Sequence, residues 1–163
     1  MSDPTNAAGD SGTTTTAVRV RPLEQGDFFA WYELYSGYAD FYETPLQDER
    51  AMRAWTWLHS DASAMRGLVA VDADGTVMAL AHVREFERLL ENDRGLYLED
   101  LFVGPRFRNR GVARAIFDHL KQEARDRGFG VIRWITAEDN YRGRAVYDRV
   151  GTKTKWVTYD IPL

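Results

Sequence analysis

The segment from residue 96 to residue 136 constrains the fold of this chain most strongly. An apolar run at residues 96–103 is followed by an arginine-rich loop, an amphipathic helix pattern at 111–126 and a second apolar run at 131–136. A strand, a helix and a strand in this order form a β-α-β crossover, because the helix returns the chain so that the two strands lie parallel. The sequence therefore predicts an α/β protein with a sheet.

Hydrophobic periodicity predicts the remaining elements, with alternation indicating strands and three- to four-residue steps indicating helices. Asp74 and Gly75 are typical of a hairpin turn between two of the strands. The element order is then β-α-α-β-β-β-α-β-α-β, a mixed sheet with antiparallel and parallel pairs. The other expected strands are 17–21, 67–71, 76–84 and 155–161, and the other expected helices are 28–38, 46–59 and 141–149.

The chain has 163 residues, which suits one domain. Residues 1–16 carry few side chains that could be buried, so we expect a flexible N-terminal tail followed by a single domain at 17–163. No run approaches the roughly 20 apolar residues of a membrane helix, and no secretory leader is present. These features favour a cytoplasmic protein without a membrane partner.

Composition also excludes several kinds of chemistry. The absence of cysteine removes thiolate nucleophiles, disulfides and Cys-based zinc or iron–sulfur sites, and the three histidines are not spaced as metal ligands, so we expect no metal. Neither a G-x-S-x-G elbow nor a phosphate-binding G-x-x-x-x-G-K-[ST] loop is present. The net charge of −4 argues against nucleic acid as a partner and suits a cationic small substrate.

The loop before the helix at 111–126 is a candidate anion site. The first amides of a helix lack intrahelical partners, and the helix dipole favours negative charge there. Small residues at Gly111 and Ala113 allow a phosphate to approach the backbone, while Arg108, Arg110 and Arg114 add charged donors. A diphosphate fits this pattern, and a solvated arginine loop that caps an ordinary helix fits it equally well.

Three segments resemble the GCN5-related N-acetyltransferase (GNAT) family. Arg108-x-x-Gly111-x-Ala113 is similar to the family's acetyl-CoA-binding motif, and residues 140–151, which include Asn140 and Tyr147, are similar to a second family segment. The sequence LEDLFV at 98–103 resembles the fourth strand of the polyamine and thialysine acetyltransferase branch. The resemblance spans residues 18–161 and implies a central twisted mixed sheet with helices on both faces.

The resemblance implies that the chain binds acetyl-CoA as acetyl donor and forms a homodimer. In the family the fourth and fifth strands splay apart at a bulge, and the pantetheine arm lies between them. Asn140 would bond that arm on its other side. The implied pantetheine contacts on the strand are Leu101, Phe102 and Val103. The implied pyrophosphate contacts are Arg108, Asn109, Arg110, Gly111, Val112, Ala113 and Arg114.

Two side chains are candidate catalytic groups. An amine with a pKa near ~10 must lose a proton before it attacks, and Glu99 matches the base of the family branch. Tyr147 is the candidate acid that protonates the departing thiolate, and it would also contact the cofactor. Without a catalytic role, Glu99 would be an exposed carboxylate on a strand and Tyr147 would be a tyrosine of the core. Asp100 points to the opposite face from Glu99 if the strand is regular, so only a bulge would bring both to one side.

The acceptor is expected to be a primary amine of a small molecule, attacked directly in a ternary complex. Tyr42 and Glu43 at the end of the first helix, Glu99, and Trp156 on the last strand are candidate contacts for it. Aromatic residues at helical spacing are also typical of a core, and His82 suits an ordinary strand position. A protein lysine or N-terminal acetyltransferase and a non-catalytic coenzyme A sensor remain as alternatives.

Overall fold

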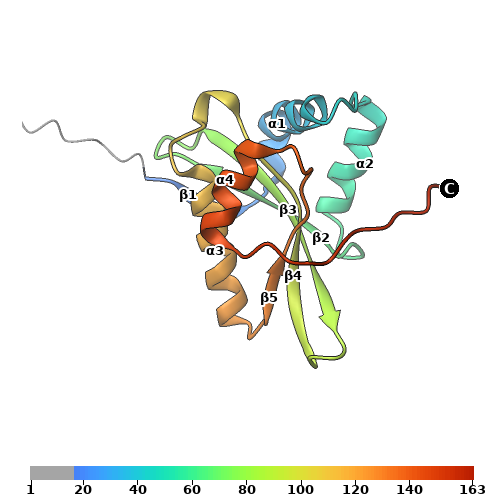
Figure 1. Cartoon of the computed structure of the whole chain (residues 1–163). Helices are drawn as coiled ribbons and strands as arrows, with labels where there is room; N and C mark the ends of the chain where they lie inside the picture. Colours follow the sequence, from blue (N-terminus) through green and yellow to red (C-terminus); the bar gives the residue numbers. More distant parts are fainter. Residues whose placement is uncertain (1–16) are drawn as a thin grey trace, which may run out of the picture.

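The computed structural model describes residues 17–163, so the expected tail at 1–16 lies outside the described residues. The chain forms a mixed sheet with helices packed on it (Figure 1). The strands are β1 (Arg19–Pro22), β2 (Met65–Val71), β3 (Val77–Arg88), β4 (Asp93–Val103) and β5 (Val131–Arg133). The helices are α1 (Phe28–Phe41), α2 (Asp48–Leu58), α3 (Val112–Asp126) and α4 (Tyr141–Val150).

The sheet has the predicted mixture of strand directions. Its order is β1-β2-β3-β4-β5, with antiparallel pairs from β1 through β4 and a parallel pair between β4 and β5. Helix α3 connects the two parallel strands, so the β-α-β crossover expected from residues 96–136 is confirmed.

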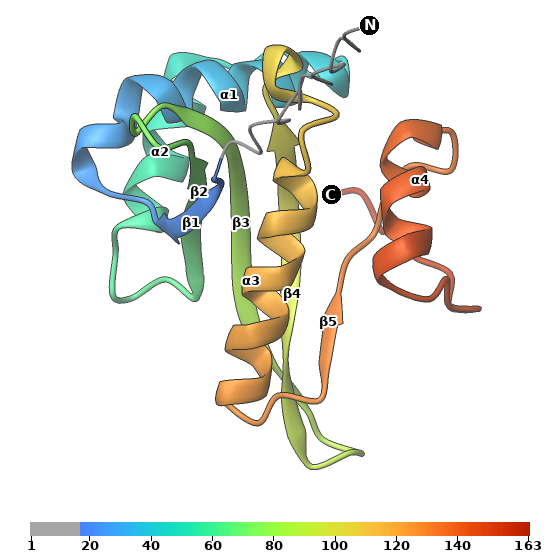
Figure 2. The same cartoon turned by 90° about the vertical axis from the view of Figure 1, so that its left-hand side faces the viewer.

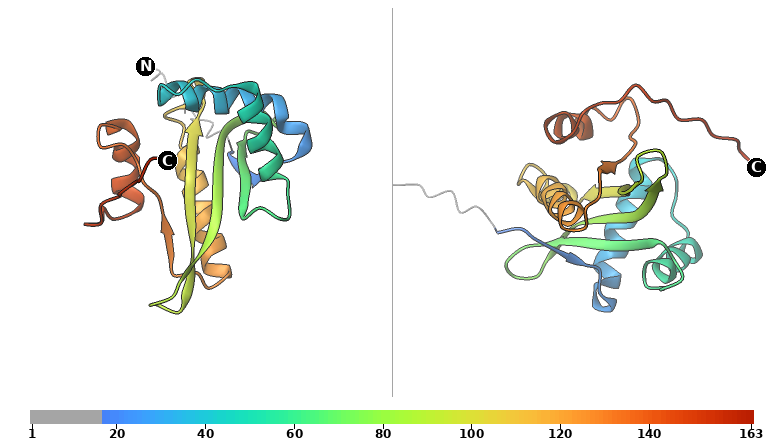
Figure 3. Two further views of the ribbon diagram at one scale, coloured as in Figure 1. Left: turned by 90° about the vertical axis from the view of Figure 1, so that its right-hand side faces the viewer. Right: turned by 90° about the horizontal axis from the view of Figure 1, so that it is seen from below.

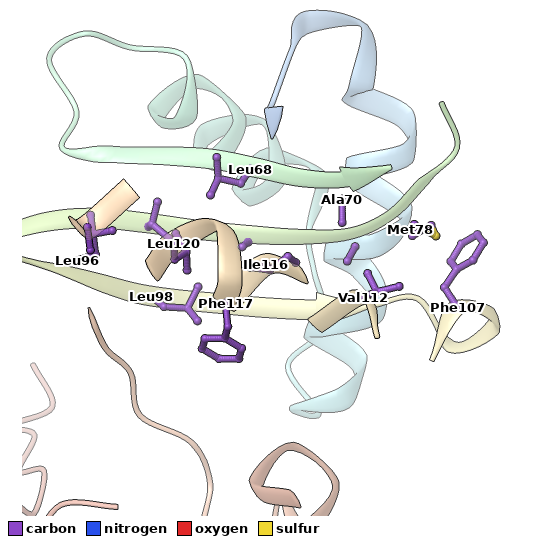
Figure 4. Packing of buried hydrophobic residues seen from close by; sticks show 14 residues of the cluster. Leu68, Ala70, Met78, Leu96, Leu98, Phe107, Val112, Ile116, Phe117 and Leu120 are labelled. Carbon is purple, nitrogen blue, oxygen red and sulfur yellow. The ribbon is translucent and has the colours of Figure 1, made fainter. Parts of the chain in front are cut away.

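The helices cover both faces of the sheet (Figure 3). Helix α3 buries Ile116, Phe117 and Leu120 against Leu96 and Leu98 of β4, as Figure 4 shows. Full burial of each such side chain contributes roughly 1.5–3 kcal/mol, which fixes α3 on the sheet beside the loop that precedes it. On the opposite face, α1 and α2 pack around Trp31, Leu34, Ala51, Trp55, Leu80 and Phe102.

The expected last strand at residues 155–161 is wrong. Residues 151–163 are exposed and contain no strand in the part of the chain that the structure describes. Figure 3 shows this segment leading away from the sheet. Alternation alone does not make a strand, because a strand needs a neighbour that takes its hydrogen bonds, and here the alternating apolar side chains meet neither a partner strand nor a core.

No helix formed by residues 17–163 combines the length and the apolar character that crossing a bilayer requires. The three-residue β5 is also shorter than the expected run at 131–136, since only residues 131–133 pair with β4.

Candidate active site

A bulge in β4 determines which side chains can act together. His82 of β3 pairs with Asp100 and Val83 pairs with Leu98, so Glu99 is an extra residue that has no partner of its own in the register. Leu98 and Leu101 are three residues apart and would lie on opposite faces of a regular strand. Because of the bulge, both pack toward α3. The bulge brings Glu99 and Asp100 to the other face, which α1 and α2 cover.

The Glu99 carboxylate is held by an arginine from the neighbouring strand. The Nε–H of Arg84 donates to Oε1 of Glu99 at 2.5 Å, and both side chains are about one-third exposed. The Arg84 guanidinium also lies over the ring of Tyr97, 4.7 Å from its centroid. These contacts fix the direction of the Glu99 carboxylate on the face where the sequence predicts the amine acceptor.

Asp100 is held by a different set of groups, all of them buried or half-buried. Its Oδ2 lies 2.7 Å from Nδ1 of His82, and Tyr38 of α1 is a neighbour of the carboxylate. Burial alone would raise the pKa of Asp100, but its contacts with His82 and, to a smaller extent, Tyr38 outweigh burial and keep this pKa below its usual range. Asp100 is therefore ionised at neutral pH.

The last residues of β4 have no neighbouring strand on the side of β5. The two strands pair only where Gly95, Leu96 and Tyr97 meet residues 131–133, and beyond that point they diverge (Figure 2). Leu101, Phe102 and Val103 thus lie on the splayed part of β4. Among the described contacts, the Val103 carbonyl accepts from Nε of Arg108 at 3.1 Å.

The loop before α3 has the backbone of a compact anion site. Asn109 and Gly111 take positive φ values of 62° and 77°, and Gly111 caps the helix that begins at Val112. The first amides of α3 have no intrahelical acceptor, so they can donate to a bound anion. The arginines differ in direction: Arg108 lies over Phe102 and Arg110 over Phe107, whereas Arg114 pairs along its own helix with Asp118 at 3.1 Å.

Helix α4 presents Asn140 and Tyr147 on the far side of the splayed strands. Asn140 caps the helix: its Oδ1 accepts from the amide of Gly143 at 3.0 Å, and its Nδ2 donates to Thr136 at 2.9 Å. An amide side chain has further donor and acceptor capacity beyond these two bonds. The Tyr147 ring packs on Phe117 and Trp134, and burial raises the pKa of its hydroxyl.

The predicted acceptor residues are only partly brought together. Tyr42 and Glu43 lie at the end of α1, where the Tyr42 ring contacts Tyr38 at 5.0 Å and Glu43 takes a left-handed φ of 53°. Burial is the larger cause of the raised pKa of Tyr147, and the Tyr42 hydroxyl adds to it. Trp156 is 86% exposed in the C-terminal segment and does not join this cluster.

Sequence reasoning did not connect three residues to the carboxylates that they contact. Tyr38 is expected from the sequence only as an aromatic residue at the acceptor pocket, His82 is expected only as a strand residue, and Arg84 is not identified at all. The paired acidic residues at 99 and 100 were the available signal, since buried or half-buried carboxylates need donors. No group of three or more His, Asp and Glu side chains that could hold a metal ion occurs within residues 17–163.

Comparison with known proteins identifies the family to which this arrangement corresponds. Residues 29–152 match the family model described as the acetyltransferase (GNAT) family. The chain is 27% identical over 143 residues to the D-amino-acid N-acetyltransferase HPA3 of Saccharomyces cerevisiae, covering 87% of this chain and 89% of that protein. It is 36% identical over 69 residues to a thialysine N-epsilon-acetyltransferase of Caenorhabditis elegans, covering 39% of this chain and 43% of that protein.

Solved structures agree with the fold. A ribosomal-protein-alanine N-acetyltransferase from Brucella melitensis superposes with a TM-score of 0.78 at 21% identity, covering 90% of this chain and all of that one. An aminoglycoside acetyltransferase from an uncultured soil sample superposes with a TM-score of 0.68 at 22% identity, covering 90% and 99%. At these identities the likeness concerns the fold alone.

Proposed function

The chain belongs to the GNAT family of N-acetyltransferases, and from that premise we propose that it transfers an acetyl group from acetyl-CoA to a primary amine of a small molecule. The observation that carries this proposal is the β4 bulge. It places two carboxylates on the face covered by α1, beside the part of β4 that has separated from β5. A cationic amine and an extended donor could meet there.

The donor would lie along the splayed part of β4 and end at the loop before α3. Backbone groups of successive strand residues point to alternating sides, and the Gly104 amide donates to Met78 of β3. Leu101 and Val103 therefore have backbone groups on the side of β5 that could bond an extended amide chain, whereas the backbone groups of Phe102 face β3. The first amides of α3, with Arg108 and Arg110, offer donors suited to a pyrophosphate. Arg114 could contact the pyrophosphate only if its ion pair with Asp118 broke. Asn140 uses part of its amide group to cap α4, and the rest could form hydrogen bonds with the donor.

The chemistry requires one proton to leave the amine and one to reach the thiolate. We assign the first step to Glu99, acting directly or through a water, because the Arg84 contact directs its carboxylate to the acceptor face. We assign the second to Tyr147, whose raised pKa keeps the hydroxyl protonated at neutral pH. Acetyl-CoA supplies the activated acetyl group. The chain has no cysteine, and direct attack in a ternary complex needs no acyl-enzyme.

The acceptor class follows from the relatives and the charge of the site. The two curated relatives act on a D-amino acid and on thialysine by name, and both are small amines. The aromatic rings of Tyr38 and Tyr42 and the carboxylates of Glu99 and Asp100 suit a small cationic group. We therefore place the acceptor among amino acids and polyamines, with Tyr42 and Glu43 at the entrance.

An acetyl-CoA turnover assay across amines tests this proposal. Thiol release would be followed with D-alanine, thialysine, spermidine, an aminoglycoside and a lysine peptide as separate acceptors. We expect release with a free small amine and not with the peptide. Release with the peptide alone would favour a protein acetyltransferase, and acetyl-CoA binding without any release would favour a sensor.

We also propose that two copies of the chain form a homodimer. Trp156, Tyr159 and Ile161 are each at least 86% exposed in the extended C-terminal segment, and such side chains are costly to leave in water. Light scattering should give twice the chain mass for the full protein. A variant that ends at residue 153 should be monomeric, and a dimer of that variant would remove the segment from the interface.

A further inference from the structure

The hydrogen bonds of His82 fix which of its two ring nitrogens carries a proton. The indole Nε1–H of Trp31 donates to Nε2 of His82 at 2.9 Å. An indole nitrogen can only donate, so the Nε2 atom must present its lone pair and cannot be protonated. The proton of the neutral ring then lies on Nδ1, which donates to Asp100 at 2.7 Å.

This tautomer has a consequence for the charge of the site. A neutral His82 donates a hydrogen bond to the Asp100 carboxylate but does not neutralise it, and the hydroxyl of the neighbouring Tyr38 is also uncharged because burial raises its pKa. Within residues 17–163, no arginine or lysine forms an ion pair with Asp100, whereas Glu99 is paired with Arg84. The negative charge of the bulge therefore resides on Asp100, whose side chain is 22% exposed.

We propose that Trp31 restricts His82 to its neutral, Nδ1-protonated tautomer, so that Asp100 keeps an unneutralised charge that binds the ammonium group of the acceptor. Asp100 is then a binding residue, and Trp31 and His82 are positioning residues that act through it. The inference rests on the proposed function for the identity of the ammonium ion, but the tautomer is a property of the chain alone.

The surroundings support a neutral ring. Trp31 is fully buried and His82 is 4% exposed, so water does not compete for Nε2. From α1, the titratable groups that face His82 and Asp100 are Tyr35 and Tyr38, and burial raises the pKa of both hydroxyls. On β3 and β4, the neighbouring charges are Arg84 and Glu99, which neutralise each other. From α2, Trp55 packs on Trp31 and adds no charge.

The tautomer can be measured on the unaltered protein by nitrogen NMR of the imidazole rings. His82 would be assigned among the three histidines by the loss of its signals in His82→Gln. At neutral pH we expect one protonated nitrogen, Nδ1, and one unprotonated nitrogen, Nε2. Two protonated nitrogens at this pH, or a proton on Nε2, would overturn the inference whether or not the protein turns over any amine.

Trp31→Phe removes the indole donor and leaves Nε2 free to take a proton. The Michaelis constant (KM) for spermidine should then rise about tenfold more between pH 8 and pH 6 than it does in the unaltered protein. The double variant Trp31→Phe/His82→Gln should lose this added pH dependence, because glutamine cannot be protonated. A KM profile in Trp31→Phe that matches the unaltered protein would contradict the role of Trp31.

Binding of the ammonium can be tested without turnover. Calorimetry with spermidine should give about tenfold weaker binding for Asp100→Asn than for the unaltered protein. Asp61→Asn, which removes an exposed carboxylate elsewhere, is the matched control and should bind as the unaltered protein does. Equal binding by the two variants would refute Asp100 as the ammonium site.

Discussion

Replacing Gly111 by aspartate should weaken acetyl-CoA binding by about a few hundredfold while the protein stays folded. Gly111 caps α3 with a φ of 77°, and a Cβ added there would meet no atom within 4 Å. The cost of substitution is therefore backbone strain rather than a clash, roughly 1–2 kcal/mol for a left-handed residue. Asparagine tolerates the same conformation and has the same shape, so Gly111→Asn is the matched control that lacks only the charge.

The magnitude follows from the proposed pyrophosphate position. Two phosphate charges about 5 Å from the new carboxylate, at an effective dielectric constant of about 40, repel it by about 3 kcal/mol in total. This corresponds to a loss of a few hundredfold in affinity relative to the asparagine variant.

The assay is calorimetric titration with acetyl-CoA, accompanied by circular dichroism to verify that both variants fold. We expect the asparagine variant to bind within about fivefold of the unaltered protein and the aspartate variant to bind hundreds of times more weakly. Affinities within threefold of each other for the two variants would refute the placement of the pyrophosphate at this loop.

Three further predictions address the catalytic groups and the stability of the fold. Tyr147→Phe should lower kcat by about 10²–10⁴-fold and leave acetyl-CoA affinity within a few-fold, and an unchanged kcat would exclude Tyr147 as the acid. Glu99→Gln should change the pH–rate profile, because it removes the proposed base; a profile identical to that of the unaltered protein would mean that another group accepts the proton. Hydrogen bonds from Arg21 hold the pKa of Asp27 below its usual range, so this pair stabilises the fold above about pH 4 and loses its effect as the pH falls further. Asp27→Asn should accordingly reduce the free energy of unfolding by about 1–3 kcal/mol at neutral pH and by less in acid, as measured by urea titration at both pH values.

The elements that could be predicted from the sequence are those specified by residues only a few positions apart. The helix at 112–126 has an apolar stripe and a glycine at each end, and the hairpin before β3 has Asp74-Gly75, where Gly75 takes a φ of 85°. These features act over a few residues, and each appears in the structure as expected. The parallel pair of β4 and β5 followed from the helix between them.

The arrangement of the site was less accessible, because it depends on contacts between distant residues. The bulge at Glu99 is set by the register against β3, and the sequence could state only that both carboxylates need a bulge to share a face. The His82–Trp31 hydrogen bond joins residues 51 positions apart, and no local pattern reports such a pair. The prediction of a last strand at 155–161 was wrong for the same reason, because alternating residues do not indicate whether a partner strand is present.

Transfer of an isotopically labelled acetyl group tests the central claim most directly. Acetyl-CoA labelled in the acetyl group would be mixed with the full protein and a small amine such as D-alanine or spermidine. The masses of the products and of the protein would then be measured by mass spectrometry. The proposed function predicts the label on the amine nitrogen, one free thiol for each acetylated amine, and no label on the protein. Label on the protein, or none on any small amine, would contradict direct transfer to a small-molecule acceptor.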